Sequence, residues 1–452
     1  MTPVLIVGGS ARAAAQSVRR AGGVPITIDA FADRDLDSLA GASVRVAQYP
    51  DELVQVAQRF PPSDWLYTGA LENHPAIIAD ISTRHRLLGT PAENLASVRD
   101  PRRLFDQLRA QQIAVPNTVW TANERSALQP HHSTTWLRKA RRSGGGQQIH
   151  WCHSPASGTS GTASTHANAS AGGDTDTPAD DDAASSYYWQ EYLPGESYGV
   201  VFLAAGGQAD LWGITAQLVG RNWPHDSPPA TNPATNLATN LAMKLAMNLA
   251  MNLANNPATA AELLTRANFD YAGSIGPLSF SAELETEIQR IGKTIARLGN
   301  LSGIFGVDLL IPSSSLATTQ PTTTAQIFVL EVNPRWTASV EILERATGQN
   351  AFQLHQAACT QGQLLPPRAR AAASLHGKLV VYAEKQSEVS SALSDRWLDR
   401  AQGQTWPTLA DIPRAGEMIP AGAPICTLFA SGLTPADVAT QLQTARAELR
   451  RG

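Results

Sequence analysis

The segment from Glu331 to Arg335 combines a carboxylate, an amide and an arginine directly after the apolar run 328–330. An apolar run of this kind is typical of a buried strand. Glu331 and Asn333 are two positions apart, so their side chains point the same way on an extended backbone. Polar side chains that share a direction at the end of a core strand indicate either a solvated turn or a ligand site.

A second carboxylate, Asp308, lies in the middle of the predicted strand 303–312. We expect this strand to pair with 326–332 as an antiparallel hairpin, which brings Asp308 towards Glu331 and Asn333. Two carboxylates and an amide form an oxygen-only set that suits Mg²⁺, and the lack of sulfur and imidazole speaks against zinc. Arg335 would then face a phosphate, because its planar fork offers paired donors. The alternative is a polar hairpin end with Arg335 in a surface ion pair.

Lys139 lies on a predicted strand and is followed by Gly144, Gly145 and Gly146. Backbone N–H groups of glycines can approach phosphate oxygens closely, and a lysine adds charge. The segment lacks the GK[ST] ending of a P-loop. Its alternative interpretation is a flexible turn between two paired strands.

The first 95 residues alternate strand and helix signals, which predicts a parallel, doubly wound sheet. Ligands of such sheets bind beyond the carboxyl ends of the strands. The residues that qualify by that position are Ser10, Arg12, Asp29, Glu72, Asn73 and His74. The order of residues 8–13 does not match GxGxxG, so a dinucleotide is not expected.

The fold class predicted from these patterns is α/β, with an α+β central part. Residues 98–116 are predicted to form one amphipathic helix within a linker. Two segments are predicted to be insertions: 152–186, which lacks large apolar residues, and 227–260, which has a four-residue leucine period. The predicted units are 1–97, the linker 98–118, 119–210, 211–375, and a β-rich unit with a closing helix at 376–452.

Composition excludes several classes of protein. The 452 residues are 43% hydrophobic and carry a net charge of -4 without a basic stripe, so nucleic acid is not an expected partner. No apolar run approaches the roughly 20 residues of a membrane helix. The three cysteines are widely spaced, which indicates neither a disulfide framework nor a zinc site. The N-terminal segment is expected to be a core strand, and the expected compartment is the cytoplasm.

The order of these motifs resembles the ATP-grasp superfamily over about residues 1–360. Lys139 and the glycine segment are followed by QEYLPGES at 190–197, GVDLL at 306–310 and EVNPR at 331–335. The resemblance implies an ATP-grasp fold that follows an N-terminal Rossmann-like, pre-ATP-grasp domain. The tail resembles the small C-terminal β-rich unit of some members.

The resemblance implies a role for each matching position. Contacts with ATP are implied for Lys139, for the mobile loop Gly144, Gly145 and Gly146, for the adenine strand from Glu191 to Leu193, and for Glu196 at the ribose. Magnesium binding is implied for Asp308, Glu331 and Asn333. Arg335 would stabilise the transferring phosphoryl group.

The chemistry implied is that of a C–N ligase. A substrate carboxylate attacks the γ-phosphate of ATP, and an amine then attacks the acyl phosphate to form an amide. The segments 6–36, ENHP at 72–75 and 333–348 are similar to ATP-grasp proteins of tetrahydromethanopterin- and methanofuran-linked one-carbon metabolism, which implies a glutamate ligation in cofactor synthesis. Candidate substrate contacts are Ser10, Arg12, Asn73 and Ser339.

One departure from the family pattern concerns a lysine that many members place at the start of the helix predicted at 98–116. The sequence here reads Asp100, Pro101, Arg102, so either Arg102 or Arg103 replaces it or the contact is lost. Two other functions stay open: a carboxylase that uses bicarbonate, and a nucleotide-binding regulatory protein without turnover. The expected partners are a small-molecule carboxylate and an amine, with a homodimer as a candidate assembly.

Overall fold

The computed structural model describes residues 3–127, 135–152, 186–221, 223, 269–312, 326–364 and 374–451. The predicted insertion 227–260, the predicted loop 313–325 and all but the two end residues of the predicted insertion 152–186 lie outside the described residues. No helix described here has the length and apolar character needed to cross a bilayer.

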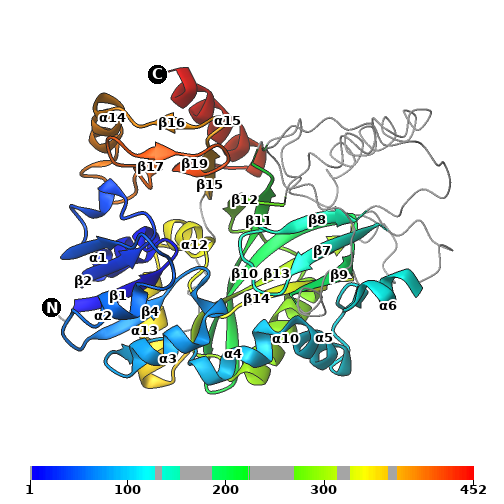
Figure 1. Cartoon of the computed structure of the whole chain (residues 1–452). Coiled ribbons are helices and arrows are strands. Elements are labelled where there is room, and N and C mark those ends of the chain that lie inside the picture. Colours follow the sequence, from blue (N-terminus) through cyan, green and yellow to red (C-terminus); the bar gives the residue numbers. More distant parts are fainter. Residues whose placement is uncertain are drawn as a thin grey trace, which may run out of the picture.

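The N-terminal part is a five-stranded parallel sheet in the order β3-β2-β1-β4-β5 (Figure 1). Side chains of β1 alternate between its two faces, as a strand requires. Val4 and Ile6 pack with α1, whereas Leu5 and Val7 pack with α2 and α3. Helices therefore cover both faces, and the predicted doubly wound sheet is confirmed. Its elements are β1 (Pro3–Gly8), α1 (Arg12–Arg20), β2 (Val24–Asp29), the 3-10 helix η1 (Arg34–Leu36), β3 (Ala42–Arg45), α2 (Leu53–Ala57), β4 (Asp64–Tyr67), the 3-10 helix η2 (Leu71–Asn73), α3 (Pro75–Ser82) and β5 (Arg86–Leu87).

The linker predicted as one helix consists of two, α4 (Ala92–Arg99) and α5 (Pro101–Ala110), so that prediction is wrong. Proline disfavours a helical conformation in the preceding residue, and Asp100 is extended, with φ -79° and ψ 111°. The Asp100 side chain accepts hydrogen bonds from the backbone N–H groups of Arg102 and Arg103, as the N-cap of α5. The break leaves Arg99 at the end of α4, with consequences for the site.

A four-stranded antiparallel sheet in the order β6-β9-β7-β8 follows. It contains the predicted pair of strands around the glycine segment, β7 and β8. Its elements are β6 (Thr118–Val119), α6 (Ala122–Ala127), β7 (Trp136–Ala140), β8 (Ile149–Cys152) and β9 (Tyr187–Glu191).

The largest sheet has eight antiparallel strands in the order β14-β13-β10-β11-β12-β15-β19-β17. One face packs against α4, α5 and α10, where the rings of Phe202 and Phe305 stack 5.1 Å apart. The opposite face meets α12, α13 and the N-terminal sheet. Its elements up to residue 364 are β10 (Gly195–Ala205), β11 (Gln208–Val219), β12 (Tyr271–Gly276), α10 (Ala282–Gly299), β13 (Gly303–Pro312), β14 (Phe328–Asn333), α12 (Val340–Thr347) and α13 (Ala351–Gln361).

The C-terminal unit is continuous with this sheet, because β15 pairs with β12 and β19 pairs with β15. The closing helix α15 packs on the same strands, through Val438 and Leu442. The boundary placed between residues 210 and 211 likewise falls inside β11, whose strand continues from the turn at Gly206 and Gly207. The remaining elements are β15 (Leu375–Tyr382), β16 (Ser387–Glu388), α14 (Ser391–Ala401), β17 (Leu409–Ala410), β18 (Met418–Ile419), β19 (Pro424–Gly432) and α15 (Pro435–Arg451).

Candidate active site

The hairpin of β13 and β14 brings the predicted metal ligands together. Asp308 lies directly opposite Glu331 in the strand register. One carboxylate oxygen of Asp308 accepts a hydrogen bond from Asn333 Nδ2 at 3.2 Å, and the other accepts one from Gln217 Nε2 at 2.8 Å. Burial and the neighbouring charge of Glu331 raise the pKa of Asp308 to about 7. Two carboxylates in mutual repulsion form the kind of site that a divalent cation would stabilise.

Magnesium fits this donor set as an oxygen-binding cation that keeps part of its water shell. Among the described residues, no group of three or more His, Cys, Asp or Glu side chains could hold a metal. A cation here would therefore depend on Asp308, Glu331, the amide of Asn333, and oxygens supplied by water or a phosphate.

Arg335 lies beside this set and is held by the N-terminal sheet. Its Nε atom is 2.9 Å from a carboxylate oxygen of Glu72, whose side chain is fully buried. Its two other nitrogens donate to the backbone carbonyl of Trp336 at 3.1 Å and to Asn333 Oδ1 at 3.0 Å. The guanidinium thus bridges the end of β14 and the segment after β4, where it borders a cavity.

Arg99 lies at the centre of the polar cluster, although the sequence did not single it out. One of its terminal nitrogens donates to Glu331 Oε1 at 2.6 Å and to the carbonyl of Val332 at 3.0 Å. The other donates to Asn73 Oδ1 at 2.7 Å and to the carbonyl of Ser143 at 2.9 Å. The guanidinium of Arg99 therefore connects the strand of the predicted metal ligands, the N-terminal sheet and the glycine segment.

Lys139 is almost fully buried on β7, and its Nζ donates to Gln190 Oε1 at 3.1 Å. After β7, the carbonyl of Gly145 accepts a hydrogen bond from the backbone N–H of Tyr271 at 2.9 Å. Gly146 has φ +77°, and a Cβ there would overlap the carbonyl oxygen of Phe269. The segment 143–146, which we call the glycine loop, is therefore held against residues 269–271 and, through the Ser143 carbonyl, against Arg99.

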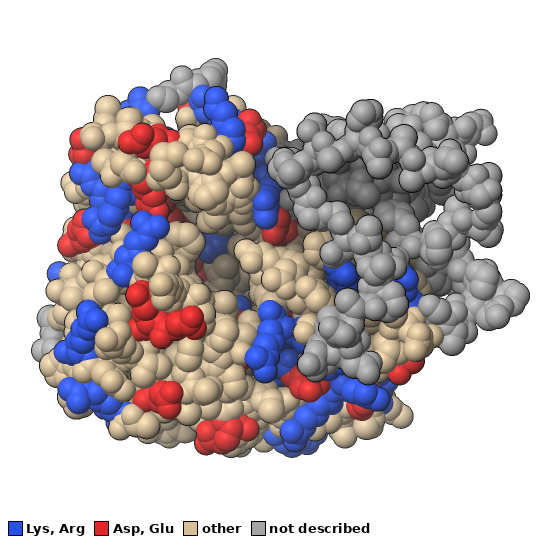
Figure 2. All heavy atoms as spheres, in the orientation of Figure 1, with Lys and Arg blue, Asp and Glu red and all other residues tan. Residues whose placement is uncertain are grey.

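The glycine loop separates two cavities. The smaller has a volume of about 30 Å³ and is lined by Arg99, Lys139, Gly146 and Glu331. The larger, which we call the central cavity, has a volume of about 550 Å³ and is lined by Gly144, Gly145 and Arg335, by the N-terminal sheet and by the C-terminal unit. Figure 2 shows the hollow at the centre of the molecule.

The four predicted substrate contacts lie in different surroundings. Ser10 is exposed and lines the central cavity, as does Asn73. Arg12 also borders it, but its five N–H donors are all taken by Gln16, Glu341 and Asp411. Ser339 is buried, accepts a hydrogen bond from Thr215 at 2.9 Å, and lies 3.2 Å from the hydroxyl of Ser274. Asn73 is buried, with its Oδ1 accepting from Arg99 at 2.7 Å and its Nδ2 donating to the carbonyl of Ser143 at 3.4 Å. Ser10 is thus the one of the four that is exposed to the cavity.

The residues predicted for the adenosine part lie where the four-stranded sheet passes into the large sheet. Glu191 ends β9, and its carboxylate accepts a hydrogen bond from Asn117 Nδ2 at 2.6 Å. Leu193 is half-buried in the connection to β10. Glu196, early in β10, accepts a hydrogen bond from the Tyr198 hydroxyl at 2.6 Å, and burial raises its pKa. Their contacts with a nucleotide stay a prediction.

A protein-family model for the ATP-grasp domain matches residues 98–339, which is more than half of the chain. The chain belongs to the ATP-grasp family. The match spans the glycine loop, both strands of the hairpin with the predicted metal ligands, and Arg335. Membership places the activity in the class of ATP-dependent ligases and carboxylases.

Solved ATP-grasp structures share this architecture over nearly the whole chain. The ADP complex of N5-carboxyaminoimidazole ribonucleotide synthetase matches with a TM-score of 0.61 at 13% identity, over 99% of this chain and 96% of that one. The biotin carboxylase domain dimer of 2-oxoglutarate carboxylase from Hydrogenobacter thermophilus was solved with ADP, its magnesium salt and bicarbonate. It matches with a TM-score of 0.63 at 10% identity, over 99% of this chain and 89% of that one. The L-amino acid ligase from Bacillus licheniformis matches with a TM-score of 0.57 at 11% identity, over 100% of this chain and 97% of that one. These likenesses confirm the predicted fold.

A curated relative, the large chain of carbamoyl phosphate synthase from Neisseria gonorrhoeae, is 36% identical over 80 residues. The matched residues are 18% of this chain and only 6% of that protein. This short match adds no information on the substrate.

Two residues of the site, Arg99 and the Arg335 partner Glu72, were not predicted as members of it, for different reasons. Asp100 and Pro101 are a recognisable helix start, so the break after Arg99 had a sequence signal. Glu72 was noted only as a residue after a strand, and nothing in the sequence pairs it with Arg335, 263 positions away by their residue numbers. That contact depends on how the N-terminal sheet docks on the hairpin.

Proposed function

We propose that this chain is an ATP- and Mg²⁺-dependent ligase that activates a substrate carboxylate as an acyl phosphate for attack by an amine. The observation that carries the proposal is the hairpin that faces Asp308 with Glu331 and places Asn333 and Arg335 at the same strand end. Lys139, Arg99 and the glycine loop add positive charge and backbone donors next to it. ATP-grasp family membership supports the same class of chemistry.

In the proposed reaction, a carboxylate oxygen attacks the γ-phosphorus of ATP, and ADP leaves. The nitrogen of the amine then attacks the carbonyl carbon, a proton leaves the nitrogen, and inorganic phosphate departs to give the amide. Arg335 and Lys139 would neutralise charge on the transferring group, which is the dominant need in phosphoryl transfer. When bound to Asp308, Glu331 and Asn333, Mg²⁺ would supply further charge neutralisation at the phosphates.

The glycine loop would cover the reaction. The smaller cavity beneath it has room for about one or two waters, so a nucleotide would enter only when the β7–β8 hairpin moves outward. Reclosure through the contacts of Ser143 and Gly145 would exclude water, which would otherwise hydrolyse an acyl phosphate.

The test is magnesium-dependent ADP formation with pools of carboxylic acids and amines, in wild type and in Asn333→Ala. We expect the substitution to lower the rate at least tenfold, because it removes an oxygen ligand and a partner of both Asp308 and Arg335. Asn94→Ala is the matched control, since the Asn94 side chain donates a hydrogen bond to the backbone carbonyl of Asn300, outside the predicted metal-ligand set.

Equal ADP formation in Asn333→Ala and wild type would refute the metal assignment. An amide product identified by mass spectrometry would support the ligase. Bicarbonate-stimulated ATP hydrolysis would instead identify a carboxylase. ATP binding without turnover would identify a nucleotide-binding regulatory protein.

For the substrate pair, the resemblance to proteins of tetrahydromethanopterin- and methanofuran-linked metabolism leads us to include a glutamate ligation in the proposal. The comparisons with known proteins give no support for that pathway. The substrate pools should therefore contain glutamate with pterin and furan precursors beside unrelated acids and amines, so that the product itself decides.

A further inference from the structure

The end of the central cavity that lies beyond β2 is acidic. Asp33 follows β2, and its side chain is only 7% exposed yet lines the cavity. Asp411, from the C-terminal unit, lines the same end. Acidic residues are common on surfaces. Whether this end is a binding site therefore depends on whether each carboxylate already has a partner inside the protein.

The neighbouring carboxylates are already used inside the protein. Asp29 accepts backbone hydrogen bonds from Ala11, Phe31 and Ala32. Asp35 accepts those of Asp411 and Ile412, at 3.1 Å each. Asp411 itself binds Arg12, with its two oxygens 2.7 and 3.2 Å from the guanidinium nitrogens.

Asp33 differs from these neighbours. In the described part of the chain, no hydrogen-bond donor and no cationic side chain lies within bonding distance of its carboxylate, although more than nine-tenths of the residue is buried. Burial first, and then the charges of Asp411, Asp35 and Asp29, raise its pKa well above the ordinary value, and the more distant Arg12 opposes the rise. A buried carboxylate that opens only to a cavity is costly unless a partner binds it.

The surroundings favour an organic cation over a metal ion. Among the described residues there is no cluster of three acidic, histidine or cysteine side chains that could bind a metal. The wall of the cavity that Asp33 lines includes apolar groups, namely Phe31, Val380 and Ile425. A carboxylate with an apolar wall suits an ammonium or guanidinium group carried on a hydrocarbon body.

The acidic end is distant from the phosphoryl-transfer end. Asp33 follows β2, whereas Arg335 contacts Glu72, after β4. The strand β1 lies between β2 and β4 in the sheet. Two strand spacings separate the ends by about 10 Å. A cation at Asp33 is therefore not the group that reacts beside Arg335.

We propose that Asp33 binds an ammonium or guanidinium group of one of the two substrates, at the end of the central cavity opposite Arg335. The assignment to a substrate depends on the proposed ligase function, whereas the cation site itself depends only on the cavity. The proposal makes one substrate an elongated organic cation whose charged group lies about 10 Å from the reacting end.

The test measures binding of pentylammonium to the full chain by calorimetry, without nucleotide, with pentan-1-ol as the uncharged probe. We expect pentylammonium to bind at least tenfold more tightly than pentan-1-ol, and Asp33→Asn to abolish that preference. Asp395→Asn is the matched control, since Asp395 is 60% exposed and pairs with Arg34. An asparagine side chain is similar in size to that of aspartate, so the Asp33→Asn variant should melt at the wild-type temperature or above.

Proton release gives an independent readout. Because burial raises the pKa of Asp33 in the free protein, cation binding should lower that pKa and promote release of a proton, which appears as a heat that depends on the buffer. Affinity for pentylammonium should therefore rise with pH, and both effects should vanish in Asp33→Asn. The charged groups that act on this titration are Asp29, Asp35, Asp411, Arg12 and Arg414.

Unchanged pentylammonium binding in Asp33→Asn, or equal binding of pentan-1-ol, would overturn the cation site. The variant Asn333→Ala separates this proposal from the ligase proposal, because it should retain pentylammonium binding. Binding that depends on Asp33, in a protein that forms no ADP with any pool, would keep the cation site and reject the ligase. ADP formation in a protein that does not bind pentylammonium would keep the ligase and reject the cation site.

Discussion

At the scale of single residues, the site depends on arginines that each serve several acceptors. The planar guanidinium of Arg99 reaches Glu331, Val332, Asn73 and Ser143 at once. Lysine has a single charged nitrogen and could not reproduce this fork. Arg99 occupies the region where the family pattern led us to expect a lysine contact, whereas Arg102 and Arg103 were the candidates from the sequence.

We predict that Arg99→Ala weakens the binding of magnesium ATP about 10- to 100-fold, because a hydrogen bond with a charged partner contributes about 1.5–3 kcal/mol. Arg99→Lys should recover part of the loss by keeping the charge. Arg103→Ala is the control, since Arg103 is exposed at the start of α5. Calorimetric titration with magnesium ATP measures the affinity of all three variants. Weaker binding in Arg103→Ala alone would show that Arg103, rather than Arg99, replaces the family lysine.

At the scale of elements, the glycine loop is fixed by a close approach of two backbones. Gly146 adopts φ +77°, a conformation that side chains disfavour, and its Cα lies against the Phe269 carbonyl. The hydrogen bond from Tyr271 to Gly145 depends on the same approach. Gly144, by contrast, has open space around it and no left-handed backbone.

We predict that Gly146→Ala opens the loop while Gly144→Ala leaves it closed. The strain of a left-handed alanine, about 1–2 kcal/mol, should raise the open population roughly tenfold. Limited trypsin digestion without nucleotide reports this directly, because Arg141 and Arg142 precede the loop. Equal cleavage rates at these arginines in both variants would show that the contact with Phe269 does not hold the loop.

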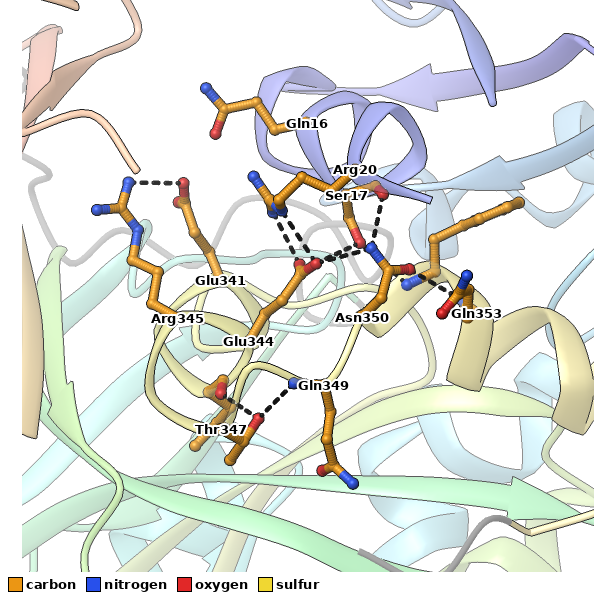
Figure 3. A network of polar contacts seen from close by, with 12 residues as sticks. Gln16, Ser17, Arg20, Glu341, Glu344, Arg345, Thr347, Gln349, Asn350 and Gln353 are labelled. Carbon is orange, nitrogen blue, oxygen red and sulfur yellow. Dashed lines mark hydrogen bonds and ion pairs between the residues drawn. The ribbon is translucent and has the colours of Figure 1, made fainter. Parts of the chain in front are cut away.

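At the scale of the whole molecule, buried ion pairs connect the N-terminal sheet, the large sheet and the C-terminal unit. Arg12 of α1 binds both Glu341 of α12 and Asp411, and Glu341 also lies 3.6 Å from Lys378 of β15. A second cluster adds Arg20, Ser17 and Asn350 around Glu344, as Figure 3 shows. These contacts position the walls of the central cavity.

Glu341 is the carboxylate on which this network depends. Burial alone would raise its pKa, but the charges of Arg12, Lys378 and Arg345 hold the pKa well below the usual value. The stability from this group is thus present above the unfolded-state pKa near 4.5 and lost as the pH falls below it.

We predict that Glu341→Gln lowers the free energy of unfolding at pH 7 by about 3–5 kcal/mol, because it leaves buried cations without their partner. The difference from wild type should shrink as the pH falls below 4.5. Urea unfolding at pH 7 and at acidic pH tests both statements. Glu287→Gln, in an exposed pair with Arg290, should cost at most about 1 kcal/mol; a similar small loss in Glu341→Gln would contradict the prediction.

The sequence alone determined the features that arise from local patterns. The alternation of strand and helix signals predicted the parallel sheet. The spacing of Asp308, Glu331 and Asn333 predicted the hairpin with its facing carboxylates. Lys139 was placed on a strand and the three glycines in the turn to its partner strand, as the structure has them. Each of these depends on residues close in the chain or on the pairing of two successive strands.

Only the tertiary structure decided which distant groups meet. Arg99 reaches Glu331 because the chain breaks at Pro101, and Arg335 reaches Glu72 because two sheets dock. Asp33 lacks a partner because Arg12 is already bound to Glu341 and Asp411. Such contacts are set by the packing of whole sheets and by competition among charges for a few partners, and no sequence period records either of them.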